Sequence, residues 1–168
     1  DEAVSHYLKS RYGQSMGRLN TFALFINTAM NALVAKAGLL GFIVPNTVLT
    51  QGYYQFVRSD LLTHRIASLT TFTAPVFKGA VVETVIAVVQ RGGSSGTVVS
   101  VEMRNDEPER PLESRNLKQE YFRSTFQNAF NVRLSPELIE LKRKLDQDRP
   151  RLGMIANLNQ AIALKSNR

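Results

Sequence analysis

Few residues in this chain have the types and spacing that side-chain catalysis requires. Its 168 residues include no Cys and only two His, whereas a structural zinc site needs about four ligands. The sequence has no G-x-S-x-G motif and no His paired with an acid, and Ser94-Ser95 lies within a loop-like stretch. We therefore expect neither a metal site nor a nucleophilic triad.

Two other groups of residues could bind a ligand or phosphate groups. Pro45-Asn46 follows an apolar run, at the point where open α/β sheets bind ligands beyond the carboxyl end of a strand. Lys142-Arg143-Lys144 could face phosphates, although such a run is often a solvated helix face. The formal net charge of +7 favours a polyanionic partner, but many proteins with other roles are equally basic.

The elements that position these residues predict an α/β fold. Periodicity indicates helices over residues 20–35 and 50–62, with Asn20 and Thr50 as their caps. Residues 39–44 read as a strand buried on both faces of a parallel sheet. Three more strands are expected over residues 66–72, 81–89 and 97–103, and a helix over residues 136–148 that begins at Ser135-Pro136-Glu137.

Charge divides the chain into two regions. Residues 1–90 hold 7 basic and 4 acidic residues, whereas residues 91–168 hold 14 and 10. The change falls at the flexible composition of residues 92–96, which predicts a core followed by a more solvated extension. No apolar run reaches the roughly 18 residues of a membrane span, and the acidic start lacks the order of a signal peptide. We expect a cytoplasmic protein.

Three motifs follow one another in the first region: GRLNTFALFI at residues 17–26, GFIVPNT at 41–47 and VFKGAVVETVI at 76–86. In this order and spacing the chain resembles the C-terminal half of the catalytic domain of adenine-specific DNA methyltransferases from restriction–modification systems. The gamma class, often fused to an endonuclease, is the most similar. The resemblance covers residues 7–91 well and continues less sharply to residues 151–160, which are similar to the start of the DNA-recognition domain.

This resemblance implies the second half of a Rossmann-like methyltransferase sheet with an antiparallel last strand, and a mixed, helix-containing C-terminal extension. It also implies the domain limits. Residues 1–91 would complete the catalytic domain, 92–96 form a flexible loop, 97–151 a basic extension, and 152–168 the start of the recognition domain.

The family's binding roles map onto a few positions of this chain. Phe25 matches the aromatic that packs on the adenine of S-adenosylmethionine, although a Phe on an apolar helix is often core. Phe77 matches the aromatic that stacks on the adenine rotated out of the duplex, or else it anchors its loop. The remaining candidates are Pro45 and Asn46 for the substrate cleft, and Tyr53, Arg58, Lys142, Arg143 and Lys144 for DNA contact.

Two motifs that the family needs for catalysis are absent from the sequence. The chain contains no G-x-G, the turn that binds the cofactor, and no Pro-Pro, so it has no Asn-Pro-Pro-Tyr motif. Both precede the matching region in the family. We therefore expect the whole enzyme to methylate the exocyclic amino group of adenine in double-stranded DNA, and this chain alone to be inactive and to bind S-adenosylmethionine weakly.

The expected partners are double-stranded DNA and the N-terminal half of the catalytic domain. An open sheet edge at residues 39–44 would also favour self-association. Two alternatives stay open. One is a non-catalytic DNA-binding or assembly module that retains the half-sheet. The other is a remnant of a small-molecule methyltransferase, which predicts no salt-sensitive DNA binding.

Overall fold

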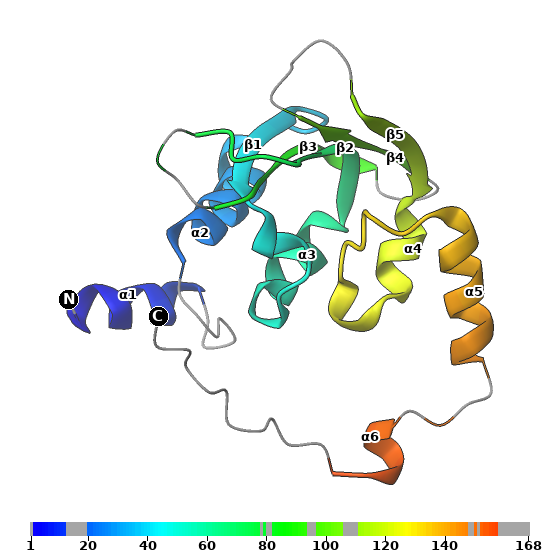
Figure 1. Cartoon of the computed structure of the whole chain (residues 1–168). Helices are drawn as coiled ribbons and strands as arrows, with labels where there is room; N and C mark the ends of the chain where they lie inside the picture. The colour runs from blue at the N-terminus through cyan, green and yellow to red at the C-terminus, as the bar shows by residue number, and fades with distance from the viewer. Residues whose placement is uncertain are drawn as a thin grey trace. The chain divides into compact units, whose positions relative to one another are not determined.

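The computed structural model describes residues 2–12, 20–77, 79, 82–93, 97–105, 111–147, 150 and 152–157. The chain divides into two compact units, residues 1–132 and residues 133–168, and each is described by itself. Within the described residues, no helix is both long enough and apolar enough to cross a bilayer. The first unit contains the sheet and the helices α1 to α4, and the second contains α5 and α6 (Figure 1).

A mixed sheet of five strands forms the first unit, which confirms the α/β class. Its strands are β1 (Leu39–Pro45), β2 (His64–Phe72), β3 (Thr84–Gly93), β4 (Val98–Arg104) and β5 (Glu113–Lys118), in the order β1-β3-β2-β4-β5. β3 lies between β1 and β2 and is antiparallel to both, so the predicted antiparallel last core strand is confirmed. β4 runs parallel to β2, and β5 is antiparallel to β4.

The helices of the first unit are α1 (Glu2–Tyr12), α2 (Thr21–Thr28), α3 (Gln55–Leu61) and α4 (Gln119–Ser124). α2 continues as a π-helical turn, Ala29–Leu33, and 3-10 turns occupy Asn46–Leu49, Gly52–Tyr54 and Phe126–Asn128. Figure 1 shows α2, α3 and α4 on one side of the sheet. The core between them contains Met30, Val57, Ile66, Leu69, Val85 and Phe122, all at most 2% exposed.

Of the two predicted helix caps, Asn20 does occupy the N-cap position of α2, whereas Thr50 does not begin a helix. Asn20 has extended backbone, but its side chain makes no cap bond, and its Nδ2 instead donates to the hydroxyl of Tyr54 at 2.9 Å. Thr50 precedes a 3-10 turn, and α3 begins only after Tyr54. At Asn20 the side chain therefore makes a tertiary hydrogen bond where a capping bond was expected.

The prediction that residues 39–44 are buried on both faces is also corrected. β1 is at the edge of the sheet, pairs with β3 alone, and leaves Leu39 63% and Ile43 38% exposed. A continuous apolar run indicates that both faces suit burial, but among the described residues only one face is covered. The expected open edge at these residues is therefore present.

Replacing Ile43 with Lys is expected to weaken self-association of the chain roughly tenfold, because a charge at an unpaired edge opposes strand pairing. Sedimentation over a concentration series measures this. Val98→Lys is the matched control, since Val98 is 48% exposed on β4, which has neighbours on both sides. An equal weakening in both variants would contradict an interface at the β1 edge.

Residues 97–105 and 111–132 belong to the first compact unit together with the preceding strands. The side chain of Gln119 is fully buried, accepts from the backbone N of Ile66 at 2.9 Å, and donates to the carbonyl of His64 at 2.7 Å. β5 was not predicted, because its sequence ESRNLK has only one apolar residue and shows no strand pattern. The finer domain limits given above stay predictions.

The second unit contains α5 (Pro136–Asp146) and α6 (Leu152–Ile155). The predicted start of α5 is confirmed, since Ser135 Oγ accepts from the backbone N of Leu138 at 3.3 Å and Pro136 occupies the first turn. The three leucines of α5, Leu138, Leu141 and Leu145, are each about half exposed.

Candidate functional site

The carboxyl end of β1 is held against the start of β3. Asn46 donates from its backbone N to the carbonyl of Glu83 at 2.9 Å, and from Nδ2 to Glu83 Oε2 at 2.5 Å. Pro45 pairs with Thr84 in the last register position. The two cleft candidates thus lie together where the sheet ends, and Asn46 is fixed by Glu83, a partner that the sequence motifs did not indicate.

Phe77 lies in the loop that follows β2, and its side chain is half exposed. The start of this loop is attached to β4 by a hydrogen bond from the backbone N of Thr73 to the carbonyl of Arg104, at 2.9 Å. A ring that stacks on an extruded base must be accessible from one face, and Phe77 meets that condition. Its role in base stacking stays a prediction.

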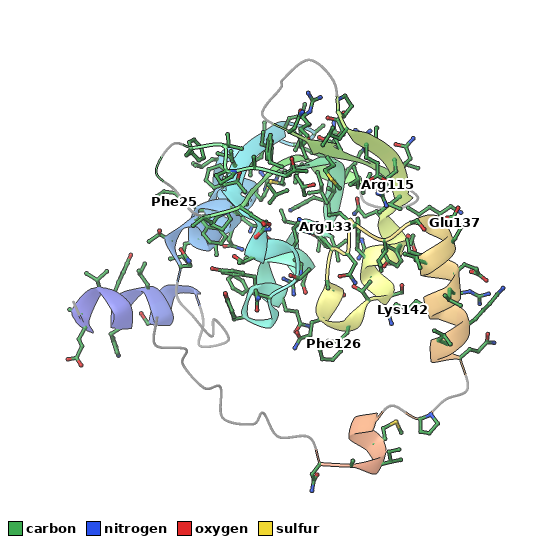
Figure 2. The ribbon with its side chains drawn as sticks, viewed as in Figure 1. Phe25, Arg115, Phe126, Arg133, Glu137 and Lys142 are labelled. Atoms are coloured by element: carbon green, nitrogen blue, oxygen red, sulfur yellow. The ribbon has the colours of Figure 1, made fainter. Side chains whose placement is uncertain are left out.

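Phe25 lies on the outer side of the buried stripe of α2 (Figure 2). Its neighbours Ala23, Leu24 and Ile26 are buried, whereas Phe25 is 65% exposed. The alternative that Phe25 belongs to the core is therefore excluded in this unit. An accessible ring suits a contact with a planar ligand, and the proposed contact with the cofactor stays a prediction.

The structure corrects the prediction that Arg58 contacts DNA. Its side chain is fully buried, and its guanidinium donates to the carbonyl oxygens of Val48, Gln51, Gln127 and Asn128 at 2.7 to 3.0 Å. Burial lowers the pKa of Arg58 to about 10, so the group stays charged at neutral pH. Arg58 therefore binds backbone and does not face phosphates.

These bonds join two segments that are far apart in the sequence. Gln127 and Asn128 have φ angles of 53° and 54°, a conformation that residues other than Gly adopt only when their surroundings fix it. The backbone N of Phe130 also donates to the carbonyl of Leu49 at 2.7 Å. Arg58 thus holds the segment after β1 against residues 126–130. In the sequence, Arg58 has the helical spacing from Tyr54 and Leu61 that places all three side chains on one face of the helix. Tyr54 and Leu61 are apolar enough to be core residues, so this spacing could have indicated the burial of Arg58.

Tyr53 is half-buried, and its ring lies edge-on to Tyr54 with the centroids 4.4 Å apart. Tyr54 itself is buried in the core. Tyr53 retains an accessible surface, so its DNA contact stays a prediction. The structure brings Pro45 and Asn46 near the start of β3. It does not place Tyr53 and Arg58 together on a surface that could contact phosphates.

The basic run Lys142-Arg143-Lys144 lies exposed on α5 (Figure 2). Arg143 forms a two-pronged ion pair with Glu140, at 2.8 Å between Nη2 and Oε1. This hydrogen-bonded pairing raises the pKa of Arg143 and lowers that of Glu140. Part of the positive charge of the run is therefore already neutralised within the helix.

If this run binds DNA, replacing Lys142 and Lys144 together with Gln is expected to reduce the slope of log affinity against log salt, by about 0.9 for each phosphate that the variant no longer binds. Fluorescence anisotropy of a labelled duplex measures the slope. Glu140→Gln releases Arg143 and should steepen the slope. An unchanged slope in both variants would show that α5 does not contact phosphates.

Comparison with known proteins gives a family match over part of the chain and a shared fold. Residues 1–77 match the Eco57I restriction-modification methylase family. The type IIG restriction endonuclease BpuSI has a TM-score of 0.57 at 17% identity, over 77% of this chain and 19% of that chain. No match was found among curated proteins.

Two further solved structures are less similar. The M protein of the type I restriction enzyme EcoKI has a TM-score of 0.46 at 19% identity, over 51% of this chain and 20% of that one. The methyltransferase subunit of a type I restriction-modification system from Streptococcus thermophilus has a TM-score of 0.44 at 14% identity, over 83% and 27%.

The similarity to BpuSI shows that this chain shares its fold with part of that type IIG restriction endonuclease. Residues 1–77 match the model of the Eco57I restriction-modification methylase family, which agrees with the resemblance seen in the motifs. The chain spans about a fifth of the length of BpuSI and of the EcoKI M protein.

Proposed function

We propose that this chain forms the C-terminal half of the catalytic domain of a restriction–modification DNA methyltransferase. The complete enzyme would transfer a methyl group from S-adenosylmethionine to the exocyclic amino group of adenine in DNA. The observation that carries this proposal is the position of β3, which lies between β1 and β2 and is antiparallel to both. The family match over residues 1–77 includes β1 and β2. That arrangement is the expected end of a methyltransferase sheet.

Within this proposal the chain contributes surfaces that position the reacting groups. A base inside the duplex cannot be reached, so the target adenine must be extruded and held by contact with its face. The half-exposed ring of Phe77 would supply this contact, worth roughly 1–3 kcal/mol. Pro45 and Asn46 would border the cleft.

The residues present fit part of a cofactor site. The exposed ring of Phe25 suits the adenine of S-adenosylmethionine, which when bound would supply the methyl group. The 168 residues contain no Gly-rich turn for the methionine part and no Asn-Pro-Pro-Tyr motif to bind the adenine amino group. We propose that polypeptide outside these residues supplies both, and that this chain alone neither binds the cofactor tightly nor methylates DNA.

The proposal is tested by comparing DNA binding with methyl transfer. The chain is titrated with duplex DNA at several salt concentrations, alone and together with the polypeptide encoded upstream of it. Methylation that appears only when both are present supports a catalytic half. Steep salt dependence with no methylation in the mixture would instead indicate a DNA-binding or assembly module and would overturn the proposal.

A further inference from the structure

A pocket of about 460 Å³ lies over the carboxyl ends of the parallel strands β2 and β4, within the size range of small-molecule sites. The strand register makes the residues at the base of the pocket neighbours, because Thr70 is opposite both Ile86 on β3 and Glu102 on β4. Phe72 is opposite Arg104 in the same ladder. Alternation then directs all five side chains to one face of the sheet.

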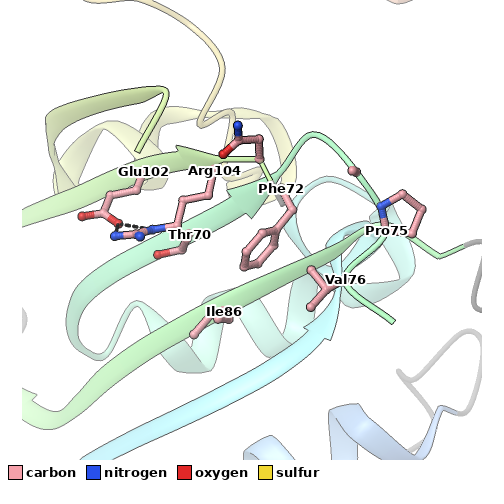
Figure 3. Close-up of a pocket in the computed structure, with 9 residues that line it drawn as sticks. Thr70, Phe72, Pro75, Val76, Ile86, Glu102 and Arg104 are labelled. Atoms are coloured by element: carbon pink, nitrogen blue, oxygen red, sulfur yellow. Dashed lines mark hydrogen bonds and ion pairs between the residues drawn. The ribbon is translucent and has the colours of Figure 1, made fainter. Parts of the chain in front are cut away.

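The two ends of the pocket differ in chemistry. In Figure 3 the Glu102–Arg104 pair lies at one end, Pro75 and Val76 lie at the other, and the Phe72 ring lies between them. Ile86 adds to the apolar part, and the hydroxyl of Thr70 to the polar part. An apolar wall with a few polar groups at one edge is the usual composition of a small-molecule site, and the ring of Phe72 suits a planar ligand.

The polar end is fixed before any ligand arrives. Arg104 donates from Nε and Nη2 to the same oxygen of Glu102, Oε2, at 3.0 and 2.8 Å. Oε1 of Glu102 is thereby left without a hydrogen bond to any described residue. The carbonyl oxygens of Glu102 and Arg104 accept from the hydroxyl of Thr71 and the backbone N of Thr73, which holds β4 in place beside β2.

We propose that this pocket binds a single unpaired nucleobase, an inference that rests on the proposed DNA methyltransferase function for the choice among planar ligands. Val76, which lines the pocket, directly precedes Phe77, so the base would lie beside the one that Phe77 holds. Glu102 Oε1 accepts a hydrogen bond from an exocyclic amino group, and Phe72, Val76 and Ile86 contact the faces of the ring. Adenine, cytosine and guanine have such an amino group.

The charge of the pocket favours a base over a phosphate. Its lining includes one carboxylate and one guanidinium, and these form an ion pair with each side chain about a quarter exposed. The described lining residues therefore carry no net positive charge that would attract a phosphate group. Thymine is disfavoured, because two carbonyl oxygens flank its ring N–H and would approach the carboxylate of Glu102.

The test is a titration of the chain with adenosine, thymidine and AMP, followed by amide chemical shifts in two-dimensional NMR. Adenosine should shift the amides of the lining residues and bind more tightly than thymidine. AMP should bind within about threefold of adenosine, with little salt dependence. No shift at the lining residues up to roughly millimolar nucleoside, or salt-sensitive binding of AMP more than tenfold tighter than adenosine, would overturn the proposal.

Two variants make the test specific. Glu102→Gln should weaken adenosine binding roughly tenfold. Glu113→Gln is the matched control and should leave it unchanged, because Glu113 forms a similar pair with Arg115 on β5 but does not line the pocket. Thr70→Val keeps the shape and should reduce the preference for adenosine over thymidine. Equal weakening by both Glu variants would contradict the proposal.

A DNA base and the adenosyl group of the cofactor both have a planar ring with an exocyclic amino group. Two ligands distinguish these two sources. An adenine-containing single strand that shifts the same amides, and is weakened by Glu102→Gln, identifies DNA as the source. S-adenosylhomocysteine binding at least tenfold tighter than adenosine would identify the cofactor and overturn the neighbouring-base role. Neither result depends on methyl transfer. A failure of the nucleobase proposal can therefore be distinguished from a failure of the proposed methyltransferase function.

Discussion

Replacing Arg58 with Met is expected to lower the free energy of unfolding of the first unit by about 3 to 5 kcal/mol. Met keeps much of the length and apolar stem of Arg but has no donor, so the carbonyls of Val48, Gln51, Gln127 and Asn128 lose the guanidinium that binds them. Buried carbonyls without a donor are costly. Urea unfolding followed by circular dichroism measures the loss of stability.

Arg65→Met is the matched control for Arg58→Met. Arg65 is exposed on β2, and its guanidinium donates to the side chain of Gln90 at 3.1 Å. The expected change is within roughly 0.5 kcal/mol, as for most surface substitutions. If Arg58→Met unfolds at the same urea concentration as Arg65→Met, the buried guanidinium does not stabilise the unit.

Replacing Phe77 with Ala is expected to reduce kcat/KM for DNA methylation by roughly 10- to 100-fold in the complete enzyme, because the extruded adenine loses its stacking partner. Cofactor affinity should not change. Steady-state methylation and a separate cofactor titration measure the two quantities. Phe77→Trp should retain most of the activity, since any aromatic face can support stacking.

Phe126→Ala provides the comparison for Phe77→Ala. Phe126 is 70% exposed, on the 3-10 turn that follows α4, and it has no part in the proposed cleft. Its removal should leave kcat/KM within about twofold. A similar reduction in both variants, or a normal rate in Phe77→Ala, would exclude the base-stacking role.

The sequence predicted the elements whose patterns are local. The strands near residues 66–72 and 81–89 and the helix that begins at Ser135 were found within a few residues, because β-branched runs and capping motifs are local signals. β5 was missed because its residues pair with β4 and bury little apolar surface. The burial of Gln119 depends on partners more than 50 residues away, which no local pattern indicates.

The candidate site was predicted in part. The motif order identified the family, and the exposure of Phe25 and Phe77 agrees with ligand-binding surfaces. Arg58 was misassigned because a basic residue on a short helix suggests solvent, whereas its four carbonyl partners become neighbours only in the folded unit. The Glu102–Arg104 pocket was not predicted, since it depends on the parallel register of β2 and β4.

We propose that these residues complete the cleft of an adenine-specific DNA methyltransferase. Nucleoside mass spectrometry of DNA treated with isotope-labelled S-adenosylmethionine tests it most directly. We expect labelled N6-methyladenine when the chain is combined with the polypeptide encoded upstream, and no label with the chain alone. Label in cytosine, efficient methylation by the chain alone, or no label from the combination would contradict the claim.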